Sequence, residues 1–194
     1  MNKSILIVAL AGSAAVASAQ SLAELIVIDL SVVNQVTLTA TDGASAVSES
    51  GSDGIGIYFE NFYAGDGSTF LNETLISGDI TNFENPSDGS PNLFRSGTTD
   101  PGLNLFSFSS DSTVTFTAGG QAFTGSAVFS LEADDYADMI ALGNRSGNIW
   151  FPADDDGDLA GASVLGTYTV IVPAPAAFSA FALGLGATAL RRRR

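Results

Sequence analysis

The chain has 194 residues, with 21 acidic residues against seven basic ones, and it contains neither histidine nor cysteine. The missing residue types exclude a histidine-based catalytic triad, a thiol nucleophile and any disulfide bond. The excess of negative charge argues against nucleic acid as a partner, because phosphates repel carboxylates.

Residues 1–19 have the pattern of a secretory signal peptide. Lys3 gives a positively charged start, an apolar stretch that forms the signal helix follows, and Ala17-Ser18-Ala19 fits the small-x-small cleavage rule. We expect cleavage between Ala19 and Gln20, which exports the mature chain. The apolar stretch is short for a membrane span, so an N-terminal anchor is the weaker alternative.

Residues 20–172 form the expected extracytoplasmic domain, a length that suits one domain with a sizeable core. All 21 acidic residues fall in this body, and its only basic residues are Arg95 and Arg145. Such a charge leaves a basic protein, a divalent cation or a neutral glycan as fitting partners. A charged shell that keeps an exported protein in solution is the simpler explanation.

Runs in which apolar and small polar residues alternate predict short β-strands throughout this domain. Residues 25–40 lose their alternation at Val33-Asn34-Gln35, which indicates a bulge or a tight turn between two strands. Gly119-Gly120 is typical of a hairpin turn and predicts that residues 103–132 form a three-stranded meander. Polar loops are expected at 41–54 and 82–102, and a helical turn at 133–142 with Tyr136, Met139 and Ile140 on one side. The predicted strands are 25–40, 55–62, 70–76, 103–109, 112–118, 121–132, 149–151 and 165–172, with Leu105 or Phe106, Val114, Phe116, Phe123, Ala127, Phe129 and Leu131 pointing inward.

Many short strands with polar turns predict an all-β domain, and we expect an antiparallel β-sandwich of jelly-roll type. An open barrel is the second choice. No internal repeat of 20 to 50 residues is visible, which argues against a solenoid or a propeller.

The densest group of candidate ligands is Asp154-Asp155-Asp156-Gly157-Asp158. Asp154, Asp156 and Asp158 alternate on a loop that a glycine allows to turn sharply, and calcium binds carboxylate oxygens of this kind. The position where an EF-hand has its bidentate glutamate is Leu165, so the loop is not an EF-hand. An acidic turn in contact with water is the competing interpretation, and no other cofactor is indicated.

Trp150 and Phe151 precede this loop and could form an aromatic platform for a sugar ring, as could Tyr58 and Tyr63. Aromatic residues at alternating positions are more often part of a core. A pair of carboxylates could also hydrolyse a glycoside, but nothing distinguishes one pair among so many acids. We therefore expect a protein that is not an enzyme.

The C-terminal segment 173–194 combines three membrane signals. Pro173-Ala174-Pro175 interrupts any preceding strand, and an uncharged apolar stretch follows up to Leu190. The 18 residues from Pro173 to Leu190 would span roughly 27 Å as a helix, close to the thickness of a hydrocarbon core of about 30 Å. We expect a transmembrane helix at about 176–190. Arg191, Arg192, Arg193 and Arg194 would stay in the cytoplasm, which places the body outside.

This order of proline tripeptide, apolar helix and arginine cluster resembles the PEP-CTERM sorting signal of bacterial envelope proteins. Ala174 stands where that family usually has glutamate, so the tripeptide is a variant of the motif. The resemblance is limited to the tail, and it implies processing by an exosortase-type enzyme.

Together these features predict an exported protein of the cell envelope or extracellular matrix. It would be anchored by its C-terminal helix, or released to the surface after processing. A calcium-dependent or aromatic-platform module that binds exopolysaccharide or envelope glycan is the alternative, and a glycoside hydrolase is the least favoured.

Overall fold

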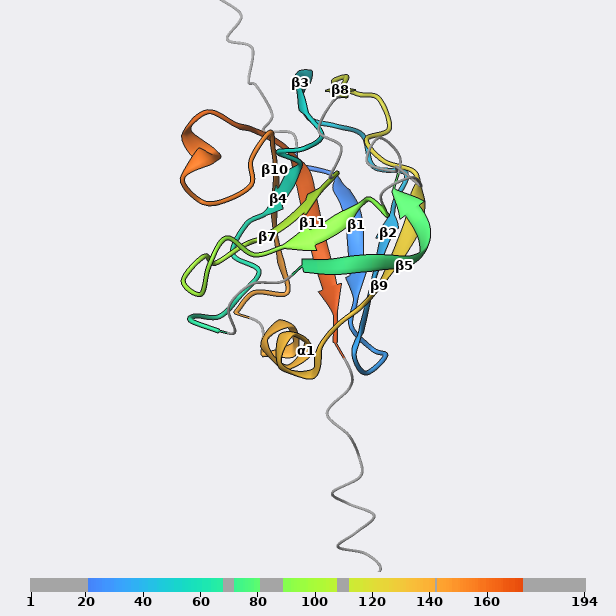
Figure 1. Cartoon of the computed structure of the whole chain (residues 1–194). Helices are drawn as coiled ribbons and strands as arrows, with labels where there is room; N and C mark the ends of the chain where they lie inside the picture. The colour runs from blue at the N-terminus through green and yellow to red at the C-terminus, as the bar shows by residue number, and fades with distance from the viewer. Residues whose placement is uncertain (1–20, 68–71, 81–88, 108–111, 142, 173–194) are drawn as a thin grey trace, which may run out of the picture.

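The computed structural model describes residues 21–67, 72–80, 89–107, 112–141 and 143–172, and the regular secondary structure of this part of the chain is mostly β-strand (Figure 1). The predicted all-β character of the domain is confirmed. The strands are β1 (Glu24–Asp29), β2 (Gln35–Ala40), β3 (Glu49–Ser52), β4 (Ile57–Phe59), β5 (Asn72–Ile80), β6 (Asn92–Phe94), β7 (Leu103–Phe106), β8 (Thr113–Phe116), β9 (Gly125–Ser130), β10 (Ser146–Phe151) and β11 (Ser163–Ile171). The helical elements are α1 (Ala133–Ile140) and the 3₁₀ helix η1 (Asp158–Ala160).

Nine of the described strands share one sheet, in the order β1-β11-β10-β4-β7-β6-β5-β9-β2, and β2 pairs with β1 so that the sheet closes into a barrel. Neighbouring strands run antiparallel except β1 and β11, which are parallel. β3 and β8 form a separate two-stranded sheet. The expected sandwich of two packed sheets is not confirmed, since one continuous sheet carries most of the strands.

The core is apolar and rich in aromatic rings. Phe59 packs edge-on against Tyr168 with ring centroids 5.4 Å apart, and Phe116 packs edge-on against both Phe123 and Phe151. Such arrangements let the electron-poor edge of one ring meet the face of another. The residues expected to point inward are confirmed as buried, namely Leu105, Val114, Phe116, Phe123, Ala127, Phe129 and Leu131.

The loss of alternation at Val33-Asn34-Gln35 is a turn between β1 and β2, as one of the two interpretations predicted. Asn34 has a φ of 58°, in the left-handed region that asparagine tolerates better than most residues. The N–H of Gln35 donates to the carbonyl of Val32 at 3.2 Å, and the carbonyl of Asn34 accepts from the N–H of Leu131 at 2.9 Å. The turn is therefore fixed against the segment that connects β9 to α1.

The predicted meander of residues 103–132 is wrong. β7 pairs with β4 and β6, β8 pairs with β3, and β9 pairs with β2 and β5. The glycine turn itself exists, because Gly119 has a φ of 78° and the N–H of Gly120 donates to the carbonyl of Thr117. A local turn signal reverses the chain but does not choose the partner strand, and strands from earlier in the chain take those positions here.

Two of these partners lie in segments that we expected to be loops. β3 is a strand of polar residues whose Ser50 hydroxyl lies 2.9 Å from the hydroxyl of Thr115 on β8. β6 lies in the long segment 82–102 and buries Asn92 and Leu93. Alternation of apolar and polar residues cannot reveal a strand of this kind, because backbone pairing defines it.

The predicted helical turn after residue 132 is α1, which packs beside the turn between β1 and β2. Tyr136 and Met139, two of the residues expected on one side of the helix, are buried, and the Tyr136 hydroxyl donates to the carbonyl of Leu30 at 2.9 Å. Ile140, the third residue expected on this face, stays 40% exposed. Among the described residues no helix is both long and apolar enough to cross a bilayer. The signal helix and the expected transmembrane helix at about 176–190 lie outside the described residues.

Two glycines with nearly the same backbone conformation allow the cost of φ strain and the cost of a steric clash to be measured separately. Gly56 has a φ of 80° and Gly119 a φ of 78°. A Cβ added to Gly56 would lie 2.1 Å from the carbonyl oxygen of Leu105, whereas one added to Gly119 would meet nothing within 4 Å. We expect Gly119→Ala to lower the free energy of unfolding by about 1–2 kcal/mol through φ strain alone. Gly56→Ala should cost about 1–3 kcal/mol more, because the backbone must also move.

Urea unfolding followed by the fluorescence of Trp150 measures both costs. Equal losses in the free energy of unfolding for the two variants would contradict this prediction. They would show that the backbone of β7 shifts easily at Leu105 to make room for a Cβ at position 56.

Candidate functional site

The candidate site is the acidic loop between β10 and β11, whose start is held by a buried amide. Asn104 on β7 donates from its side-chain nitrogen to the carbonyls of Ile55, Ile57 and Ala153, at 2.8, 3.1 and 3.0 Å. Ala153 is fully buried, so the chain enters the loop from a fixed point. The position of the next residue, Asp154, is therefore set by the barrel.

The loop then turns through hydrogen bonds made by Asp155. One of its carboxylate oxygens accepts from the N–H of Gly157 at 2.7 Å, and its other carboxylate oxygen accepts from the hydroxyl of Ser96 at 3.3 Å. Its carbonyl accepts from the N–H of Asp158 at 3.3 Å, where η1 begins. The loop is thus fixed both internally and against the segment that contains β6.

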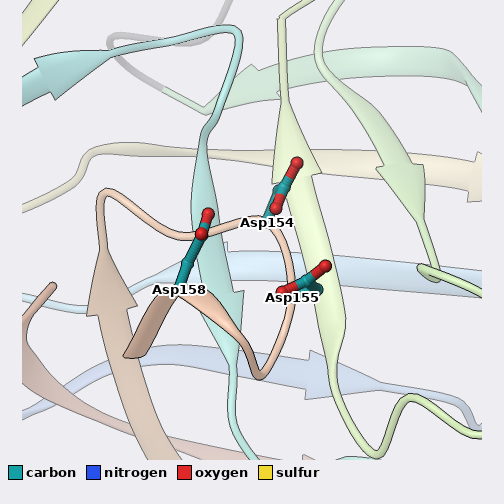
Figure 2. Close-up of side chains that lie close together, drawn as sticks. All are labelled: Asp154, Asp155 and Asp158. Carbon is teal, nitrogen blue, oxygen red and sulfur yellow. The ribbon is translucent and has the colours of Figure 1, made fainter. Parts of the chain in front are cut away.

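This turn brings Asp154, Asp155 and Asp158 together, with one carboxylate oxygen of each within 4.8 Å of the others. Figure 2 shows the three side chains close together on the same loop. Of the residues predicted as calcium ligands, Asp154 and Asp158 belong to this cluster, and Asp156 does not; Asp156 is exposed. Alternating residues share a face only where the backbone is extended, and the turn at Asp155 and the start of η1 replace that spacing here.

Crowding of the three carboxylates has an electrostatic consequence for Asp154. Its pKa is raised, first by partial burial and then by a hydrogen bond with Asp158 and by repulsion from Asp158 and Asp155. A proton or a cation at this place relieves that repulsion. Calcium takes six to eight oxygen ligands. Both carboxylate oxygens of Asp155 already accept hydrogen bonds, from Gly157 and Ser96. Water would therefore have to complete the coordination shell of a bound calcium ion.

The two residues proposed as a sugar platform have different environments. Trp150 is partly exposed, and its indole N–H donates to a carboxylate oxygen of Glu60 at 3.0 Å, the same oxygen that accepts from the amide of Asn148. Phe151 is fully buried against Phe116 and has no face for a ligand, which corrects that part of the prediction. Tyr58 and Tyr63 are buried as well.

A group of buried polar residues lies beside the acidic loop and was not predicted from the sequence. Arg95 is 1% exposed, and its guanidinium donates to the carbonyls of Asp100 and Gly65 at 2.8 and 2.7 Å and lies 4.0 Å above the ring of Tyr63. A cavity of about 50 Å³ adjoins Arg95 and Tyr63, enough space for water. The one available signal was that Arg95 is one of two basic residues in the body.

Asp100 is the acidic member of this group. One of its carboxylate oxygens accepts from the Tyr58 hydroxyl and from the N–H of Gly102. Burial is the main reason that its pKa is raised, and the charges of Asp156 and Asp155 add to it. The contacts of Arg95 and Asp100 hold the end of the long 82–102 segment against the barrel, which is a structural role.

The remaining predicted site residues belong to the two ends of the chain. Outside the described residues lie the cleavage site, with Ala17, Ala19 and Gln20, and the tail, with Pro173, Ala174, Pro175 and Arg191 to Arg194.

The raised pKa values predict that the domain is more stable in mild acid than at neutral pH. Asp100, Asp154 and Glu73 all have raised pKa values, with burial as the first cause in each case. Between the ordinary pKa values of 3.8 for Asp and 4.5 for Glu and the raised ones, the folded state keeps protons that the unfolded state has lost. The free energy of unfolding should therefore fall as pH rises through this window.

Urea unfolding at several pH values from 4 to 7.5 checks this, with Asp154→Asn as the test variant and Asp156→Asn as its control. Asp154→Asn should flatten the pH dependence, and Asp156→Asn should change it less because Asp156 is exposed and outside the cluster. Stability that rises steadily toward neutral pH in the unmodified protein would contradict the prediction.

The site thus offers three crowded carboxylates on the loop that follows the strand of the partly exposed Trp150, and the described residues show no second group of three such carboxylates. No protein-family model, no curated protein and no solved structure matches this chain.

Proposed function

We propose that this chain is an exported protein of the cell envelope, processed at a signal peptide and held or sorted through its C-terminal segment. The observation that carries the proposal is the order of Pro173-Ala174-Pro175, apolar stretch and arginine cluster. β11 ends at Ile171, two residues before Pro173, so the folded body and the sorting segment meet without overlap. An exosortase-type enzyme is the expected processing partner.

The composition of the body supports an extracytoplasmic role that is not catalytic. The chain has no histidine or cysteine, and within the described residues Arg145 is exposed whereas Arg95 is buried. A surface so dominated by carboxylates keeps copies of the protein apart and disfavours contact with anionic polymers. We propose a surface or matrix protein that meets neutral glycans or cations.

The intact mass of the protein from its native host tests the sorting proposal, with membrane and medium fractions analysed separately. A mature form that begins at Gln20 and ends near Pro173 would support a processed sorting signal. A membrane-bound form that retains Arg194 would contradict processing by an exosortase and reduce the tail to a plain anchor.

A second candidate function is calcium binding at Asp154, Asp155 and Asp158, with a glycan bound beside Trp150. The observation that favours it is the convergence of three carboxylates, at which Asp154 has a raised pKa. Repulsion among the three would be relieved by a divalent cation, and extracellular calcium sites commonly work at dissociation constants of about 0.1–1 mM. The site would then be occupied outside the cell and empty in a calcium-poor compartment.

Calcium should raise the stability of the body, measured as the thermal unfolding midpoint. For a dissociation constant of about 1 mM, 10 mM calcium would add about 1.4 kcal/mol to the free energy of unfolding. Asp158→Asn should abolish this gain, whereas Asp156→Asn should keep it. These two variants remove the same charge from the same loop, so only membership of the cluster distinguishes them. An equal gain in both variants, or with magnesium in place of calcium, would contradict a specific site.

A further inference from the structure

One end of the barrel carries a group of exposed apolar side chains. We call it the tail-side end, formed by the turn at residues 30–34, the end of β11 and α1. Val32 and Val33 in the turn are 55% and 70% exposed, Ile171 at the end of β11 is 49% exposed and Ile140 at the end of α1 is 40% exposed. Four of the seven large apolar side chains that are exposed in the described part of the chain lie here.

Pairing of β1 with β11 places these elements together. Asp29 is in register with Ile171, and the N–H of Leu30 donates to the carbonyl of Ile171 at 2.8 Å. The hydrogen bond from Tyr136 to the carbonyl of Leu30 attaches α1 to the same place. Figure 1 shows the turn, the tip of β11 and α1 at the lower end of the molecule.

The charges at this end favour a neutral apolar surface over an anionic one. The turn Ser31-Val32-Val33-Asn34 has no ionisable side chain. Exposed Arg145 lies close by, since its carbonyl accepts from the N–H of Val170 at 2.8 Å. Partly buried Asp29, and exposed Glu132 and Asp134 at the start of α1, supply negative charge around the turn.

The length of chain beyond β11 determines what this end faces. Only four residue steps separate Val172 from Ala176, where we expect the transmembrane helix to begin. Extended chain covers at most about 3.6 Å per residue, so these steps reach about 14 Å. The polar layer of a bilayer is roughly 5–7 Å thick on each side. A barrel held on so short a connection must stand with its tail-side end at the membrane.

We propose that the tail-side end rests on the outer lipid surface, with Val32 and Val33 inserted into the interface. The proposal rests on the membrane anchor of the proposed function. Two valines are too small to bind an untethered body to lipid, but the anchor makes the contact intramolecular and gives it a high effective concentration. The contact therefore fixes the orientation of the body and adds little to its attachment.

The absence of cysteine from the chain allows a direct test with single labels. Val33→Cys carries an environment-sensitive NBD fluorophore at the tip of the turn. Thr117→Cys carries the same label at the opposite end of the barrel. Gly119, near this position, donates its N–H to the carbonyl of Ser45. The following residue, Ala46, donates its N–H to the carbonyl of Leu165 near the start of β11. Both positions are exposed, so neither label should disturb folding. The full mature chain is reconstituted into phosphatidylcholine vesicles that contain spin-labelled lipid.

The label at position 33 should be quenched by the spin-labelled lipid at least severalfold more than the label at position 117, and its emission should shift to the blue. Equal quenching at the two positions overturns the proposal. Self-quenching between labels at position 33 without quenching by lipid would also overturn it, because a second copy would then cover the turn.

Flotation of the chain with the vesicles, and its resistance to carbonate extraction, are measured in the same samples. A chain that floats but shows no difference between the two labels contradicts the docked end alone. A chain that does not float contradicts both the anchor and the docking.

Discussion

The parallel pairing of β1 with β11 is the constraint on which the rest of the structure depends. It joins the first and last strands of the described chain, and every other pairing in the barrel is antiparallel. Together with the pairing of β1 with β2 it completes the closed sheet. The closing strands approach closely at Gly166, where an added Cβ would lie 2.5 Å from Leu25 and 2.7 Å from the carbonyl oxygen of Ala23. Closure removes the two free edges that an open sheet would expose to other chains.

The same pairing determines which parts of the chain lie at each end of the barrel. In a parallel pair the two strands enter at one end and leave at the other, so the start of β1 and the end of β11 lie at opposite ends of the barrel. The turn after β1 consequently adjoins the point where the chain leaves β11. An antiparallel closure would have placed the beginning of the domain, and not this apolar turn, beside the tail.

How much of the fold the sequence reveals depends on which contacts define each strand. Strands with alternating apolar residues, such as β1, β2 and β11, are visible because their pattern records which side chains are buried. β3, with its serines and Glu49, is not visible in the sequence, because only its backbone hydrogen bonds to β8 make it a strand. The pairing of β7, β8 and β9 was mispredicted for the same reason. Strand partners depend on contacts between distant segments, which local turn residues do not determine.

The candidate site, too, could be predicted from the sequence only in part. Composition alone located the acidic loop, but the members of its cluster depend on a turn that the Asp155 carboxylate makes with Gly157. Burial of Arg95 was unexpected, because an arginine is seldom buried unless its donors find acceptors. Two backbone carbonyls and the face of Tyr63 satisfy most of that need here.

The direction of β11 also determines how far the acidic loop stands from any surface that holds the tail. The loop precedes the first residue of this nine-residue strand, and the tail follows its last. At about 3.3 Å per residue the strand places them up to roughly 26 Å apart. The Debye length at physiological ionic strength is about 8 Å, so the strand can put up to about three screening lengths between the two. The charge of a lipid headgroup would barely alter the local cation concentration at Asp154, and the loop would sense the ionic composition of the medium instead.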